Sequence, residues 1–137
     1  MVVMAGIPIL RDFTLDLPLP PSANELTVNL KGGGRAKSAK YKAWLEEARW
    51  HVMTAWRGAG KPEWPEAPMR IDMALGIEGR KRDCSNCIKA IEDLLVKNLP
   101  IPDDRWNDAG SWRRDENIPG IARVTIAPLE QEGLGQP

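Results

Sequence analysis

Histidine and cysteine are scarce in this chain, which has one histidine and two cysteines among its 137 residues. With only His51, Cys84 and Cys87 available, four soft ligands for a structural zinc ion cannot be assembled from one chain. A single histidine also gives no support for a Ser–His–acid triad. The two cysteines provide no disulfide framework, and their helical spacing puts them on one face. We therefore expect buried thiols and a reducing, cytoplasmic setting.

The sequence also lacks a long apolar run and a net charge. No stretch approaches the roughly 18 apolar residues of a membrane helix, and the apolar segment 1–7 has no positively charged region before it. We therefore expect neither a signal peptide nor a membrane partner. The formal net charge of zero at first argues against a nucleic-acid partner.

The distribution of the basic residues keeps a nucleic-acid interface open, because clustered charge matters more than the sum. One block contains five basic residues and no acidic one. Its members are Lys31, Arg35, Lys37, Lys40 and Lys42. A second block is the run Arg80, Lys81 and Arg82, and Arg113 with Arg114 forms a third.

Apolar periodicity predicts a single mixed α+β domain with a small mixed sheet and two main helices. Alternation predicts strands at 12–17 and, most clearly, at 69–77. Ser38 is a candidate N-cap for a helix that ends near 58–60, and a second helix is expected at 84–97. Two strands at 109–116 and 121–127, joined by a turn at 117–120, complete the order β-α-β-α-β-β.

Four segments surround or interrupt this pattern. Residues 24–30 are ambiguous, and Gly32–Gly34 is expected to be a flexible loop with basic flanks. We expect residues 1–11 to form an N-terminal extension, 12–128 the domain, and 129–137 a flexible tail.

Carboxylates stand on both sides of the second predicted helix. Asp83 precedes it and suits an N-cap, while Asp103 and Asp104 follow it in a Pro-Asp-Asp turn, so each has an ordinary structural explanation. Together, beside the basic run 80–82 and with Lys89 in the helix, they suit metal-dependent phosphodiester cleavage. Carboxylates hold a hard divalent cation, and basic groups hold the phosphate. The two groups can meet if the chain doubles back along the helix.

The polar side of this helix continues the pattern. Asn86, Lys89 and Asp93 recur at three- and four-residue spacing and therefore stack one turn apart, with Glu92 beside them. The opposite side carries the apolar stripe that is expected to face the sheet.

These residues resemble the signature of the RusA family of Holliday junction resolvases. The resemblance lies in the run Arg82 to Lys89, in Asp93-Leu94-Leu95, and in the pair Asp103-Asp104. The segment 17–24 is similar to the family's Pro-Pro-Ser-x-Asn motif, and the whole resemblance spans about residues 13–127. It implies a RusA-like fold and a small homodimeric, magnesium-dependent endonuclease of phage or prophage type. Such enzymes cut four-way DNA junctions symmetrically during recombination and repair.

The resemblance also implies roles for individual residues. Asp83 and Asp104 match catalytic carboxylates that hold Mg²⁺, with Mn²⁺ as a substitute, and Lys89 matches the catalytic lysine. Asp103 is a further candidate ligand, and Asn86 and Asp93 are supporting residues. The expected DNA-binding residues are Lys31, Arg35, Lys37, Lys40, Arg80, Lys81 and Arg82. We expect no small-molecule cofactor.

Ser85 departs from the family pattern, because it occupies the position of a second catalytic aspartate. Its hydroxyl can support the site but supplies no charge. Two other functions therefore stay open. One is a catalytically impaired protein that binds branched DNA without cutting it. The other, favoured by the zero net charge, is an interaction domain that binds no nucleic acid.

Overall fold

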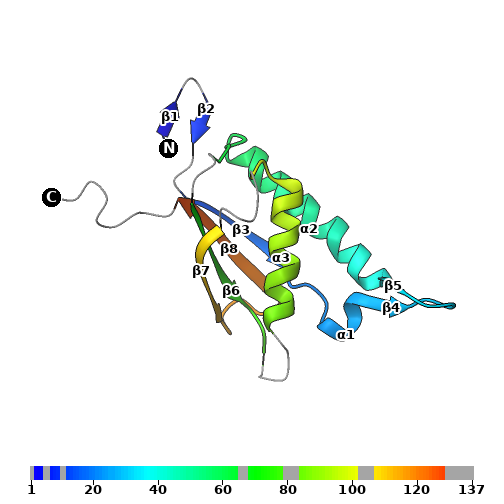
Figure 1. Cartoon of the computed structure of the whole chain (residues 1–137). Helices are drawn as coiled ribbons and strands as arrows, with labels where there is room; N and C mark the ends of the chain where they lie inside the picture. The colour runs from blue at the N-terminus through cyan, green and yellow to red at the C-terminus, as the bar shows by residue number, and fades with distance from the viewer. Residues whose placement is uncertain are drawn as a thin grey trace.

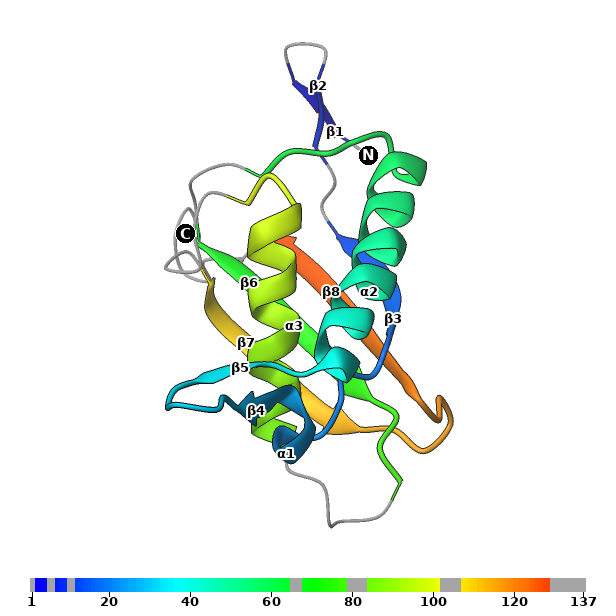
Figure 2. The same ribbon diagram turned by 90° about the vertical axis from the view of Figure 1, so that its right-hand side faces the viewer.

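The computed structural model describes residues 2–4, 7–9, 12–64, 68–78, 84–101 and 107–128. Its centre is a four-stranded sheet in the spatial order β3 (Phe13–Pro18), β8 (Ile121–Pro128), β6 (Met69–Leu75) and β7 (Asn107–Arg114). The β3–β8 and β8–β6 pairs are antiparallel, whereas β6 and β7 are parallel. Figures 1 and 2 show both long helices, α2 (Ala39–Gly58) and α3 (Cys84–Asn98), on one face of this sheet. The predicted mixed α+β fold is confirmed.

Several short elements were not predicted. β1 (Val2–Met4) pairs with β2 (Ile7–Ile9), and a four-residue helix α1 (Ala23–Leu26) precedes a two-stranded ribbon of β4 (Thr27–Asn29) and β5 (Arg35–Lys37). Strands of three residues are too short for an alternation to be recognised in the sequence. The observed element order is therefore longer than β-α-β-α-β-β.

The last two strands are joined by a short turn, yet they do not pair with each other. β6 lies between them, so the connection from β7 to β8 passes around the end of β6. Gly76, directly after β6, donates to the carbonyl of Ile121 at 2.7 Å and accepts from the amide of Gly120 at 2.9 Å. A Cβ at Gly76 would lie 1.8 Å from the carbonyl oxygen of Ile118. Only glycine fits this close approach.

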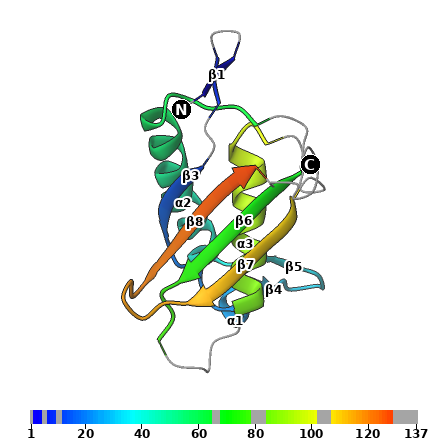
Figure 3. The same cartoon turned by 90° about the vertical axis from the view of Figure 1, so that its left-hand side faces the viewer.

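The core lies between the sheet and the two helices. Phe13, Leu15 and Leu17 of β3 are buried, as their alternation predicted. The buried stripe of α3 consists of Cys87, Ala90, Ile91, Leu94 and Leu95. Figure 3 looks onto the other face of the sheet, which no helix of the described residues covers.

Polar pairs occupy that uncovered face. Arg123 donates to Asp16 at 2.9 Å, and Arg70 donates to Asp72 at 2.7 Å. The first pair joins β8 to β3 and the second lies within β6, both at positions where solvent leaves an ion pair little net stabilising effect. The sheet is therefore apolar toward the helices and polar on its other side, the pattern of a sheet that helices cover on one face.

The parallel pair β6–β7 determines where the ends of α3 lie. Parallel neighbours need a crossover, and α3 supplies it. Met69 pairs with Asn107 and Leu75 with Arg114, so α3 begins where β6 ends and finishes where β7 begins. With a rise of about 1.5 Å per residue, Cys84 and Asn98 lie about 21 Å apart.

Among the described residues, no helix is both long and apolar enough to cross a membrane.

Candidate active site and nucleic-acid interface

The predicted metal ligands and the basic run 80–82 lie outside the described residues. These are Arg80, Lys81, Arg82, Asp83, Asp103 and Asp104. Ser85 belongs to the first turn of α3. Within the described ranges, no group of three or more His, Cys, Asp or Glu side chains could hold a metal ion. The predicted metal ligands Asp83, Asp103 and Asp104 therefore belong to segments 79–83 and 102–106, outside the described residues.

The described residues next to these two segments lie at opposite ends of α3. Cys84, which follows Asp83, begins the helix, whereas Ile101 and Asn107 flank segment 102–106 beyond its other end. In the sequence, Asp104 is three residues from each of these flanking positions. A fully extended run of three residues spans at most about 10 Å. Such a reach covers about half of the 21 Å length of α3.

Lys89 lies on the exposed side of α3, where the helical spacing predicted it. Its ammonium contacts the Asp93 carboxylate at 3.2 Å, and the two side chains are 70% and 56% exposed. A surface pair at this spacing contributes about 0.3–0.5 kcal/mol, and a lysine that precedes its acid is the weaker orientation. A phosphate can therefore compete with Asp93 for the ammonium at small cost. Asn86 is half-buried one turn before Lys89.

A groove between α2 and α3 extends from Asp93. Its volume is about 590 Å³, and its charged or phenolic lining residues are Lys37, Tyr41, Arg49, Asp93 and Lys97. Three cations against one carboxylate make this groove basic. Burial, followed by the negative charge of Asp93, raises the pKa of Tyr41 above its ordinary value. The phenol therefore stays protonated at neutral pH and can donate a hydrogen bond to an anion.

The groove brings together two groups of residues that were predicted separately from the sequence, the basic block 31–42 and the polar side of α3. Its lining includes Lys37, from the basic block 31–42, and Asp93, one turn from Lys89. Sequence reasoning missed Arg49 and Lys97, because most polar helix faces carry scattered charges and nothing in the local pattern distinguishes these two. Only the packing of α2 against α3 brings them together.

The basic residues of the ribbon are exposed, and Lys40 differs from them. Lys31, Arg35 and Lys37 are exposed to solvent. Lys40, in the first turn of α2, contacts the Glu25 carboxylate at 2.7 Å. The hydrogen bond from Lys40, followed by one from the Ser22 backbone, lowers the pKa of Glu25. Lys40 thus links α1 to α2, and its predicted contact with DNA must compete with Glu25.

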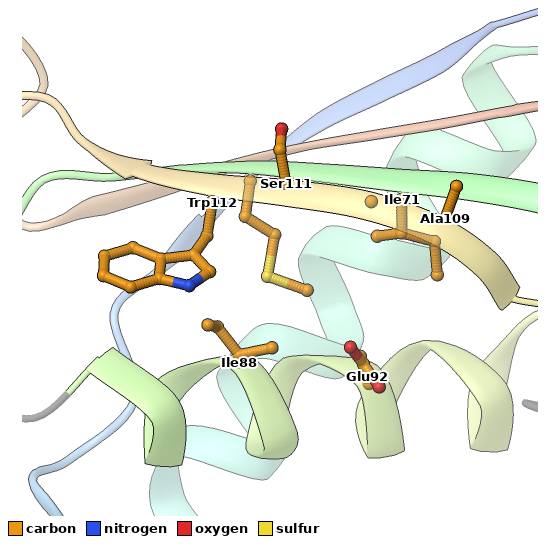
Figure 4. Close-up of a pocket in the computed structure, with 8 residues that line it drawn as sticks. Ile71, Ile88, Glu92, Ala109, Ser111 and Trp112 are labelled. Carbon is orange, nitrogen blue, oxygen red and sulfur yellow. The ribbon is translucent and has the colours of Figure 1, made fainter.

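A second groove lies between α3 and the edge strand β7. Its volume is about 300 Å³, and Figure 4 shows Ile88 and Glu92 of α3 facing Ile71 and Trp112 of the sheet. Glu92 was grouped with the polar side of the helix, but it lies at the border of the apolar stripe and is half-buried. The lining residues of this groove bring no second carboxylate to Glu92.

The fold and the basic surface over α2 and α3 define a small α+β protein suited to a polyanionic ligand. A more specific assignment comes from comparison with known families. The family described as Endodeoxyribonuclease RusA matches residues 18–126, which is most of the chain. The protein therefore belongs to the RusA endodeoxyribonuclease family, and the resemblance in its motifs is confirmed. No curated protein matches the chain.

Family membership implies a Holliday junction endonuclease, a hydrolase of DNA phosphodiester bonds that acts on branched DNA. RusA nucleases generally depend on a divalent metal ion.

Proposed function

We propose that this protein is a magnesium-dependent endonuclease that resolves four-way DNA junctions by paired incisions. The observation that carries the proposal is the family match over residues 18–126. The basic groove, whose lining includes Lys37 of the ribbon and Asp93, one turn from Lys89, supports it from the structure. Junction resolution needs cuts in two strands, so we propose a twofold homodimer with one site per incision.

The metal ligands we propose are Asp83 and Asp104, with Asp103 as a further ligand. An all-oxygen donor set of one to three carboxylates suits Mg²⁺, which keeps several waters and takes few protein ligands. Mn²⁺ accepts the same donors. When bound, the ion supplies Lewis-acid activation of the scissile phosphate and of a water molecule.

The remaining roles belong to cationic side chains. Lys89 leaves Asp93 for the scissile phosphate and stabilises the negative charge that develops there during the displacement. Arg49 and Lys97 of the groove, together with the ribbon residues and the run 80–82, hold the DNA backbone. Because each phosphate contact releases counterions, we expect junction affinity to fall steeply with salt.

The length of α3 supports a site shared between subunits. The described residues next to Asp83 and Asp104 lie at opposite ends of α3, and an extended run of three residues spans at most about 10 Å, less than the helix length of about 21 Å. A twofold partner packed with its β6–α3–β7 unit antiparallel to the first reverses these ends. We therefore propose that Asp83 shares its ion with the partner subunit's Asp104, and that Lys89 acts with Asp83.

Ser85 favours one second candidate, a protein that binds junctions without cutting them. The hydroxyl of Ser85 replaces a charged ligand, and fewer carboxylates bind a divalent ion more weakly. A cleavage assay on a synthetic four-way junction separates the two functions. Mg²⁺ or Mn²⁺ is titrated upward in this assay, so that a weakened metal site can still be filled. Paired incisions support the nuclease. Tight junction binding without any incision at every metal concentration supports the binder.

A further inference from the structure

The β4–β5 ribbon stands apart from the main sheet. Its three paired positions, Thr27–Lys37, Val28–Ala36 and Asn29–Arg35, make no ladder with any other described strand. Figure 1 shows the ribbon reaching away from the sheet beyond the helices. At its tip, Gly32, Gly33 and Gly34 all have positive φ, and a Cβ added at any of them meets no atom within 4 Å. The tip is therefore slender and open.

The base of the ribbon is nevertheless held firmly. Ser38, which follows β5, is 8% exposed and caps α2 by accepting from the amide of Tyr41 at 3.0 Å. The Ser38 amide donates to the carbonyl of Leu26 at 2.9 Å, and its hydroxyl donates to the carbonyl of Glu25. The tip is also closed by a hydrogen bond from the Leu30 amide to Gly34 at 2.9 Å. These hydrogen bonds fix the orientation of the ribbon relative to α1 and α2.

The two faces of the ribbon differ in chemistry. Side chains alternate along a strand, so Val28 and Leu30 share one face, with Ala36 opposite Val28. Val28 is 48% exposed and Leu30 is 49% exposed, and both belong to the few large apolar side chains that the described structure leaves in solvent. The other face carries Arg35 and Lys37.

Charge complementarity identifies the ligand of this ribbon. Lys31, Arg35 and Lys37 are exposed, and no acidic residue occurs between 26 and 45. Lys37 also lines the basic groove, together with Asp93, the ion-pair partner of Lys89. A polyanion with apolar surfaces between its charges matches a basic ribbon that carries exposed aliphatic side chains, and DNA has that chemistry.

We propose that the ribbon is a wedge that inserts at the branch point of the junction. Leu30, supported by Val28, packs against the faces of the bases there, while Lys31, Arg35 and Lys37 hold the flanking phosphates. This inference rests on the proposed junction-cleaving function and assigns to the ribbon the recognition of branched over linear DNA.

The wedge distinguishes branched from linear DNA because the bases are stacked differently in the two. In linear duplex DNA, an aliphatic wedge must first unstack a base step, which costs free energy. At a branch point, the terminal base pairs of the arms are more easily parted, so the same contact is made at lower cost. The basic residues, in contrast, contact phosphates, which both kinds of DNA present. The change in the ratio of junction to duplex affinity on substituting Leu30 therefore reports the apolar contact.

The test compares equilibrium binding of the full-length protein to a four-way junction and to a linear duplex, in EDTA to prevent cleavage. For Leu30→Ala and for Val28→Ala combined with Leu30→Ala, we expect junction affinity to fall about tenfold, with duplex affinity unchanged within about twofold. Lys31→Ala should weaken binding to both DNAs and reduce the salt slope by about 1. Trp50→Ala is the matched control, because Trp50 is 64% exposed but lies on α2, outside the ribbon.

A fluorescent base analogue at the branch point gives an independent readout. Wild-type protein should raise its emission through unstacking, and Leu30→Ala should abolish that rise. An unchanged junction-to-duplex ratio in the double variant overturns the wedge while leaving the proposed function intact. Loss of self-association without loss of DNA affinity also overturns it, since the apolar face then binds a second copy. Wild-type protein that binds neither DNA overturns the proposed function itself.

Discussion

Mixing two inactive variants tests whether each cleavage site takes carboxylates from both subunits. Asp83→Asn and Asp104→Asn each remove one proposed ligand with little change in shape. In a dimer that shares its sites, a mixed pair contains one site with both substitutions and one intact site. Cleavage should therefore return when the two inactive variants are combined and allowed to exchange subunits.

The size of the rescue follows from the symmetry. Random exchange makes about half of the dimers mixed, and each mixed dimer has one intact site of two, so about a quarter of all sites should work. Each mixed dimer cuts a single strand. On a supercoiled plasmid that extrudes a cruciform, the mixture should give nicked circles, whereas the wild-type protein should give linear product.

The control for this experiment mixes two variants whose substituted residues lie near the same end of α3. Lys89 lies five residues after Cys84 on the same helix, about 7.5 Å along its axis, so it belongs to the same half-site as Asp83. Mixing Asp83→Asn with Lys89→Ala should therefore restore no cleavage. If native mass spectrometry shows mixed dimers and the Asp83→Asn and Asp104→Asn pair still gives no nicking, the shared site is refuted. Equal rescue in both mixtures would refute it as well.

Other predictions concern the metal, the core and one glycine. Ser85→Asp should lower the Mg²⁺ concentration for half-maximal cleavage on the order of tenfold, since added ligand charge strengthens binding; an unchanged metal titration contradicts a ligand position for residue 85. Excess EDTA should abolish cleavage while a gel shift shows retained junction binding. Leu95→Ala, at a fully buried position, should lower the free energy of unfolding by about 2–5 kcal/mol in urea titration, whereas Val28→Ala should change it by less than about 0.5 kcal/mol. Gly76→Ala should destabilise by about 2 kcal/mol or more, because its Cβ meets the Ile118 carbonyl; wild-type stability would contradict that close contact.

The long elements of this fold were predictable because their signals are local. The alternation of Phe13, Leu15 and Leu17 predicts a strand with one buried face, and the Ser38 cap places the start of α2 correctly. The apolar stripe of α3 likewise corresponds to its buried residues. Such periodicities reflect which side of an element meets the core, and each is contained within a window of about 10–20 residues.

The ribbon was less predictable for the opposite reason. Three-residue strands carry no period, so residues 24–30 were ambiguous and the glycines were expected to form only a loop. The basic composition of 31–42 was visible, but the exposure of Val28 and Leu30 was not. An aliphatic residue in a sequence is as compatible with burial as with solvent, and the difference depends on what packs against it.

The sequence by itself determined the family, the two helices, the principal strands and Lys89 beside Asp93, because motif spacing and periodicity are properties of the chain alone. Tertiary structure decided what those parts do together. β6 pairs with β7 in parallel, which requires the α3 crossover, and the two ends of this helix lie about 21 Å apart. The packing of α2 on α3 likewise assembles the basic groove from residues distant in the chain. Sequence spacing measures distance along the chain, whereas binding and catalysis depend on distance in space.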